Sequence, residues 1–249
     1  MSNAVIENLK NHKSIRSFLD KKVEDNIIEE IIDAGIRAAT GGNLQSYSFV
    51  VINDKNKLNQ LGVYNTPLVI IALADQFRTS KWFKVDKVVD NCWVNSLQGF
   101  YIAIWDALIA LQNIVIAAES LGLGAYYYGD ITSINVKNVI NNPEYTFPAG
   151  MICLGYPNNN GKLSDRLPKE AIIHYNTYKE PTEEEIIEWY KEKETLFLMK
   201  NSKENLESFK LKNIYNLGQA YAYNKFKKDE LDKLEYGIRQ NLKESKFDL

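Results

Sequence analysis

The stretch QGFYIAIWDALIALQNIVIAAESLGLG, residues 98–124, decides the fold of this chain. The part from Gln98 to Leu121 has the pattern of a long helix, and it is apolar on almost every side. Such a helix lies at the centre of a domain or is buried in a dimer interface, because it has little surface that suits water. We expect it to stop at Leu121-Gly122-Leu123-Gly124, where glycine can supply the left-handed residue of a C-cap.

Strand patterns lie on both sides of this helix in the sequence. Residues 67–73 form a near-continuous apolar run, which is typical of a strand that is buried on both faces. Val23 to Ala39 has the spacing of an amphipathic helix, and a short helix is predicted after Thr132-Ser133. The predicted strands are Tyr47–Ile52, Pro67–Leu73, Ala125–Tyr128 and Ala149–Gly155. The chain is therefore a mixed helix and strand protein.

A change of character is predicted near Pro181. The run Thr182-Glu183-Glu184-Glu185 has the form of a capping box and opens a charged helix through about Phe197. Residues 200–249 are polar and Lys-rich, and two more helices are predicted there. We expect a compact part at residues 1–180 and an appended helical arm at residues 181–249, within one domain.

Charge and composition exclude several classes of partner. Lys and Arg number 30 against 32 Asp and Glu, so neither nucleic acid nor a membrane is an expected partner. No targeting or membrane-spanning segment is predicted, since polar residues interrupt the longest apolar stretch. Cys92 in a polar loop and Cys153 in an apolar strand lack metal or redox spacing and fit a reducing cytoplasm. With His12 and His174 as its two histidines, the chain is not expected to hold a His-based metal site or a catalytic triad.

Residues 12–16, His-Lys-Ser-Ile-Arg, gather four polar groups into little more than one helical turn. An anionic ligand suits this set, because Arg offers a planar fork, Lys a point charge, and the hydroxyl and imidazole directional partners. Two basic residues in five also suit a solvated loop. The five residues alone leave both interpretations open.

Several motifs together resemble those of the FMN-dependent nitroreductase family, in its oxygen-insensitive NADPH nitroreductase and flavin reductase branch. Each motif alone is weak, but the ordered set is specific, and it covers roughly residues 4–180. The motifs, in chain order, are Lys13–Phe18, Ala38–Phe49, Ala117–Gly124, Tyr127–Asp130, Leu154–Pro157, Arg166–Pro168 and His174–Tyr178.

The resemblance implies an α+β fold with a mostly antiparallel central sheet flanked by helices. It also implies a homodimer with FMN at the subunit interface and a C-terminal arm that wraps the partner subunit. NADPH or NADH would give a hydride to flavin N5, and a small planar acceptor such as a nitroaromatic, a quinone or free flavin would leave reduced, with ping-pong kinetics. The alternatives are a flavin reductase that serves a partner, or an FMN storage or sensing protein without significant turnover.

By this resemblance, one set of residues binds the FMN phosphate and the adjacent flavin edge: His12, Lys13, Ser14 and Arg16. Lys13 stands where the family usually has Arg, so the charge is kept and the bidentate fork is lost. Arg16 is the expected cation beside the part of the ring where reduction places negative charge. No catalytic acid, base or nucleophile is expected, because the chemistry is centred on the flavin.

A second set is expected to meet the flavin ring: Thr40, Gly41, Asn43 and Gln45 before the first strand, and Gly129 and Asp130 after Tyr128. The alternative for residues 40–45 is an ordinary helix-to-strand turn, in which Gly-Gly-Asn is common. The family usually has Gly at the position of Asp130, and we expect this carboxylate to point outward and cap the next helix.

The remaining expected contacts come from later in the chain. Arg166 is a second phosphate-binding cation by resemblance, and the family usually has Lys at the position of Ser164. Either Lys162 reaches the phosphate, or one cation is missing. Residues 76–96 either cover the site or form a surface excursion. Basic residues of the arm could receive the NADPH 2′-phosphate, namely Lys200, Lys203, Lys210, Lys212, Lys225, Lys227, Lys228 and Arg239.

Overall fold

The computed structural model describes residues 3–133 and 136–248. The chain divides into two compact units, residues 1–163 together with 233–249, and residues 164–232. The division into an FMN-binding part at 1–180 and an arm at 181–249 concerns cofactor and partner, and it stays a prediction.

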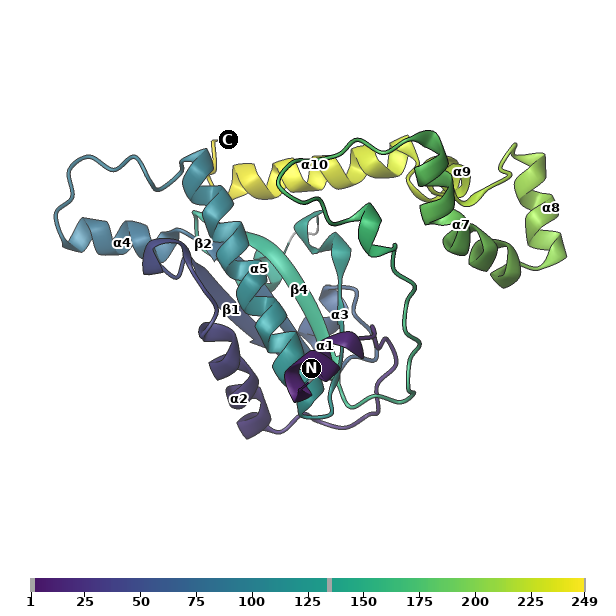
Figure 1. Ribbon diagram of the computed structural model, residues 1–249. Coiled ribbons are helices and arrows are strands. Elements are labelled where there is room, and N and C mark those ends of the chain that lie inside the picture. Colours follow the sequence, from purple (N-terminus) through teal and green to yellow (C-terminus); the bar gives the residue numbers. More distant parts are fainter. Residues whose placement is uncertain (1–2, 134–135, 249) are drawn as a thin grey trace. The chain divides into compact units, whose positions relative to one another are not determined.

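The first unit is built on a four-stranded antiparallel sheet with the order β1-β2-β4-β3 (Figure 1). Its strands are β1 (Tyr47–Ile52), β2 (Leu68–Asp75), β3 (Gly124–Tyr127) and β4 (Thr146–Gly155). All four predicted strands are present, and β1 has the predicted bounds. The prediction of a sheet that is mostly antiparallel is confirmed.

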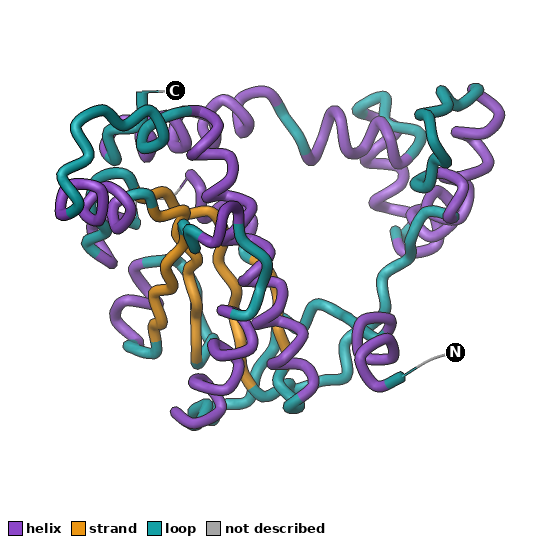
Figure 2. Tube along the Cα trace, turned by 60° about the vertical axis from the view of Figure 1, so that its left-hand side comes forward, coloured by secondary structure: helices purple, strands orange, loops and turns teal. Residues whose placement is uncertain are grey.

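The central strand β2 is buried along its whole length because both faces of the sheet are covered. Leu68 and Ile70 pack with α5 (Leu97–Ser120) and α2 (Asp25–Ile36) in one core cluster. Val69 and Ile71 point to the other face, where α3 (Lys55–Gln60) and the segment 15–18 cover them. The alternation follows from the two-residue period of a strand. Figure 2 shows the long helix running across the strands.

Helix α5 begins and ends within one residue of the prediction. Gly122 has φ of +83°, the N–H of Gly122 donates to the carbonyl of Glu119, and that of Leu123 donates to the carbonyl of Ala118. These two bonds form the Schellman motif, so the predicted glycine C-cap is confirmed.

One face of α5 is buried and the opposite face is exposed and apolar. Nine of its residues are buried, but Leu97, Tyr101, Trp105 and Ile109, spaced by four residues, are 70%, 52%, 47% and 46% exposed. Among the described residues, α5 is the one helix long and apolar enough to span a membrane by length and composition alone. Its contacts with the sheet and with α2 identify it as a core helix that also carries an uncovered apolar surface.

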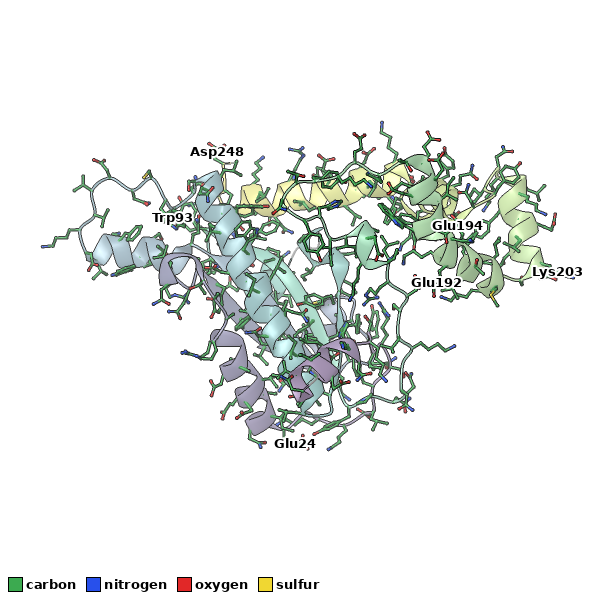
Figure 3. All side chains as sticks on the ribbon, viewed as in Figure 1. Glu24, Trp93, Glu192, Glu194, Lys203 and Asp248 are labelled. Atoms are coloured by element: carbon green, nitrogen blue, oxygen red, sulfur yellow. The ribbon has the colours of Figure 1, made fainter. Side chains whose placement is uncertain are left out.

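Short helices and the chain terminus complete the first unit. They are α1 (Ala4–Lys10), α4 (Phe77–Val85), α6 (Lys137–Ile140) and the last part of α10 (Lys228–Glu244). Phe247, after α10, is 5% exposed and packs edge-on against Phe100 of α5 at 4.8 Å between ring centroids. The N–H of Asp248, labelled in Figure 3, donates to Asn95 at 3.1 Å.

The second unit is helical. It contains α7 (Glu183–Lys200), α8 (Lys203–Leu211), α9 (Leu217–Ala220) and a π-turn at Tyr221–Lys225. The predicted capping box is present, with Thr182 and Glu185 bonding each other's backbone N–H. Glu194, labelled in Figure 3, accepts the N–H of Leu217 at 2.8 Å. The prediction of two helices beyond residue 200 is wrong, since residues 201–248 contain α8, α9 and α10.

Candidate functional site

Residues 12–16 are extended and do not form a helical turn, contrary to the compact turn suggested by the sequence. The N–H of Ile15 donates to the carbonyl of Ala125 at 2.9 Å, and Ser14 forms a parallel bridge with Ala125. The segment therefore lies along β3 like a short added strand. Alternate side chains of an extended segment point to opposite sides, so Lys13 and Ile15 share one side, and Ser14 and Arg16 the other.

Ile15 fixes this segment because its side chain packs closely against two glycines, Gly124 and Gly161. A Cβ at Gly124 of β3 would lie 2.7 Å from Ile15 Cβ, and a Cβ at Gly161 would lie 2.7 Å from Ile15 Cδ1. Ile15 is 5% exposed, so it has little room to move away. Gly161 also packs on the aliphatic stem of Lys13, with 3.5 Å between the built Cβ and Lys13 Cδ.

The family usually has Lys at the position of Ser164, and Lys162 is the candidate to replace it at the phosphate. Lys162 follows Gly161 directly, so its backbone lies next to the stem of Lys13. Ser164 and Arg166 belong to the other compact unit. There the Arg166 guanidinium donates to the carbonyls of Ser164 and Asp165 at 3.2 and 3.0 Å. Lys13 is therefore packed beside Gly161, the residue before Lys162, and Arg166 is bonded to its own loop.

His12 is anchored to the C-terminal part of α5. Its Nδ1 lies 2.7 Å from Glu119 Oε1, and the two side chains are 30% and 13% exposed. This partner of His12 was not predicted. The pair fixes the imidazole ring and leaves Nε2 as the nitrogen that can meet a ligand.

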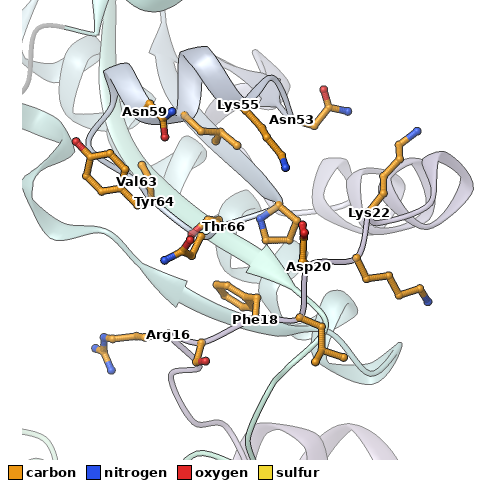
Figure 4. A pocket seen from close by; sticks show the side chains of 16 residues that line it. Arg16, Phe18, Asp20, Lys22, Asn53, Lys55, Asn59, Val63, Tyr64 and Thr66 are labelled. Atoms are coloured by element: carbon orange, nitrogen blue, oxygen red, sulfur yellow. The ribbon is translucent and has the colours of Figure 1, made fainter.

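Arg16 lines a cavity of about 920 Å³ (Figure 4). Its guanidinium carbon lies 5.6 Å from the centre of the Tyr126 ring, a cation–π distance. Across the cavity stand Tyr64, Asn65 and Thr66, which sequence reasoning missed. Asn65 has φ of +59°, and the turn composition around Asn65-Thr66-Pro67 was the signal that could have singled it out.

The loop with Thr40, Gly41, Asn43 and Gln45 meets α5 at a different place. Gly41 packs against Ile102, where a Cβ would lie 2.5 Å from Ile102 Cγ2, and its N–H donates to Asp106 Oδ1 at 3.0 Å. Gln45 Nε2 lies 3.5 Å from Asn43 Oδ1, at the limit of a hydrogen bond. Both residues are exposed.

The two predicted halves of the site are apart within one chain. Glu119, which holds His12, and Asp106, which holds Gly41, are thirteen residues apart on α5. At 1.5 Å per residue, the two anchor points stand about 20 Å from each other. The structure therefore brings residues 12–16 together with Gly161, and it does not bring residues 40–45 to them along this helix.

Gly129 and Asp130 open a 3₁₀-turn, Gly129–Ser133, that packs against β4. A Cβ at Gly129 would meet nothing within 4 Å, so this backbone faces open space. The prediction that Asp130 caps the next helix is wrong. Val136 stands at the N-cap of α6, and Asp130 is exposed in the first turn of the 3₁₀-turn.

The two ends of the segment 76–96 are joined by hydrogen bonds, and residues in its middle are exposed. Gln76, fully buried, accepts the N–H of Asn95 at 2.9 Å and donates to the carbonyl of Trp93 at 3.4 Å. Trp82 is 52% exposed and Val89 is 92% exposed. Whether this segment covers the site stays a prediction.

An antiparallel sheet crossed by one long apolar helix, with the segment 12–16 added along β3, is the α+β architecture that the resemblance implied. Comparison with known proteins gives the family. The family model described as Nitroreductase family matches residues 9–156, and the chain belongs to this family. The resemblance seen in the sequence, and the fold that it implied, are confirmed.

Individual relatives agree with this assignment. A protein named FMN reductase (NADPH) from Bacillus subtilis is 32% identical over 197 residues, which are 73% of this chain and 77% of the relative. The structure of an oxidoreductase from Bacteroides fragilis is 27% identical with a TM-score of 0.86, covering 97% of this chain and 99% of that one. The NfrA1 nitroreductase from B. subtilis is 26% identical with a TM-score of 0.80, covering 95% and 98%.

Proposed function

We propose that this member of the nitroreductase family is an FMN-dependent NAD(P)H oxidoreductase that reduces small planar acceptors. The observation that carries the proposal is the segment 12–16, which the N–H of Ile15 joins to β3 and which places Arg16 at a ligand-sized cavity. Cavities of roughly 300–1,000 Å³ are usual for cofactors and small ligands. Relatives named FMN reductase (NADPH) and NADPH-dependent oxidoreductase support the same reaction class.

The residues present fit FMN by their chemistry. Lys13, whose stem packs on Gly161, is a cation for a dianionic phosphate, and Lys162 follows Gly161 in the chain. The Ser14 hydroxyl is a hydrogen-bond donor on the opposite side of the segment. Arg16 supplies a fixed positive charge for the flavin edge, held in place by the Tyr126 ring. Gly129 leaves its backbone open for the approach of a ligand. Bound FMN would accept a hydride from the nicotinamide and pass it to the acceptor.

The site is completed by a second subunit in this proposal. The exposed apolar face of α5 is large enough to require cover, because a monomer seldom leaves such a continuous row of aromatic and aliphatic side chains in water. In a two-fold dimer with antiparallel α5 helices, the partner subunit's copy of the 40–45 loop would approach residues 12–16 of this chain. Thr40, Gly41, Asn43 and Gln45 would then contact a flavin held by the other subunit's cations.

The remaining roles follow from this arrangement. Ping-pong kinetics are expected, since oxidised nicotinamide must leave before an acceptor can use the same place. Among the basic residues of the arm, Lys210 and Arg239 are ion-paired at 3.0 and 2.6 Å, and Lys225 lies over the Tyr221 ring at 4.7 Å. The better candidates for the 2′-phosphate of NADPH are therefore Lys200, Lys203, Lys212, Lys227 and Lys228.

An anaerobic visible spectrum tests the proposal. The purified protein, loaded with FMN, should bleach within the mixing time after one equivalent of NADPH, and a repeat with NADH gives the nucleotide preference. A yellow protein that stays yellow would favour storage or sensing. A protein that does not bind FMN would overturn the proposal. Arg16→Ala should weaken FMN binding, while Arg37→Ala, an exposed arginine at the end of α2, should not.

A further inference from the structure

The loop 40–46 holds a backbone conformation that it would not adopt unaided. Gly42, Asn43 and Gln45 have φ values of +56°, +55° and +50°. Left-handed backbone costs about 1–2 kcal/mol for a residue with a Cβ, so two such residues persist only where their surroundings fix them. Two charged side chains from outside the loop do so.

The first is Asp106, a carboxylate buried in the apolar helix α5 with 2% exposure. Its Oδ1 accepts the N–H of Gly41 at 3.0 Å and its Oδ2 accepts the N–H of Ser46 at 3.4 Å. One side chain thus joins both ends of the loop. Burial raises the pKa of Asp106, and the two amide donors oppose that rise.

The second is Arg78, in the first turn of α4. Its guanidinium donates to the carbonyls of Gln45 and Tyr47, the latter at 3.1 Å, and to Ser48 Oγ at 3.3 Å. Asp75 holds Arg78 in place, since it accepts the Arg78 N–H at 3.1 Å. The fork of Arg78 therefore fixes the carbonyls on the far side of the same loop.

We propose that Asp106 and Arg78 are positioning residues that set Asn43 and Gln45 in the geometry needed to meet the flavin. The inference rests on the proposed function, because it gives these two residues a consequence for FMN. A carboxylate can accept two N–H groups, whereas Asn can accept with one atom and would turn an NH₂ donor toward the other N–H. Lysine would keep the charge of Arg78 and lose the fork that reaches several oxygens.

The test uses Asp106→Asn and Arg78→Lys in the full chain. Both should raise the Kd for FMN about tenfold or more, and should shift the visible absorption and circular dichroism of bound FMN and its reduction potential. The matched controls are Ser46→Ala, which keeps the N–H that Asp106 accepts, and Arg37→Lys, an exposed arginine on α2. Both controls should keep the wild-type Kd, spectrum and potential.

A measurement without FMN separates the two proposals. In the apoprotein, the amides of Gly41 and Ser46 should exchange with solvent faster in Asp106→Asn than in wild type, and Arg78→Lys covers the case in which Asp106→Asn fails to fold. Wild type that binds no FMN would overturn the proposed function. Wild type that binds FMN, with both variants unchanged in Kd, spectrum and potential, would overturn the positioning role alone.

Discussion

Replacing Gly161 with alanine places a methyl group 2.7 Å from the Cδ1 atom of Ile15, well inside van der Waals contact. Two costs add. Gly161 has φ of +58°, and a residue with a Cβ pays about 1–2 kcal/mol there. Crowding in a packed core costs about 1–3 kcal/mol more. We therefore expect Gly161→Ala to lower the free energy of unfolding by roughly 2–5 kcal/mol.

The crowding term can be isolated, because a single atom causes it. Ile15→Val removes Cδ1 at a cost of about 0.5–1.5 kcal/mol, and in that background Gly161→Ala should retain only its backbone cost. At Gly124 the built Cβ also lies within 2.7–2.9 Å of Ile15 Cβ, Cγ1 and Cγ2, which valine keeps. Ile15→Val should therefore rescue Gly161→Ala and should not rescue Gly124→Ala.

Gly122→Ala provides the matched control. Gly122 has φ of +83° and no atom within 4 Å of its built Cβ, so it should lose only the backbone term of about 1–2 kcal/mol. Urea unfolding gives the free energies, and flavin fluorescence quenching gives the Kd for FMN. Gly161→Ala should also weaken FMN binding, because Ile15 and Lys13 must shift, and Ile15→Val should restore it. Equal losses for Gly161→Ala and Gly122→Ala, or no coupling to Ile15→Val, would refute this account of how the segment 12–16 is held.

Three further predictions follow from separate parts of the molecule. Trp105→Glu, on the exposed face of α5, should give a monomer in analytical ultracentrifugation with unchanged far-ultraviolet circular dichroism; a dimer would contradict the interface. The Tyr156 hydroxyl donates to Glu24 at 2.5 Å, and this bond is the main cause that lowers the pKa of Glu24 to about 2. Tyr156→Phe should therefore raise the pKa of Glu24 toward 4.5 in a carboxyl NMR titration. The pKa of Glu24 is lower in the folded than in the unfolded state, so Glu24 stabilises the fold above pH 4.5 and this contribution is lost as the pH falls toward 2. The free energy of unfolding of Tyr156→Phe should fall less over this pH range than that of wild type. Thr182→Ala removes the N-cap of α7 and should cost about 1 kcal/mol, seen as faster amide exchange in its first turn, with Thr195→Ala as the mid-helix comparison.

Local patterns in the sequence were sufficient for most elements of the fold. The bounds of β1, the extent of α5, its Schellman end at Gly122 and the capping box at Thr182 all depend on residues within a few positions of each other. Such signals act through backbone sterics and local hydrogen bonds, which depend on residue types at fixed spacing and can be predicted from the sequence. Asp130 shows the limit, since its neighbours in sequence could not reveal that Val136 begins the next helix.

The site was harder to predict because its geometry comes from contacts between distant residues. The His12–Glu119 pair and the packing of Gly161 on Lys13 join residues more than 100 positions apart. Asp106 left one usable signal, as the single charged residue between Leu97 and Ala118. An uncompensated carboxylate in such a helix would be costly to bury, so its presence implies donors that the sequence does not identify.

In the proposed dimer, the separation of the two site halves along α5 would link FMN binding to dimer assembly. If each flavin is held by cations of one subunit and by the 40–45 loop of the other, FMN binds the dimer and not the monomer. By mass action, FMN must then stabilise the dimer, and dilution must weaken FMN binding. The exposed row from Leu97 to Ile109 would be covered in the same event. On this proposal, the exposed apolar face of α5 would be the surface through which two incomplete sites become complete.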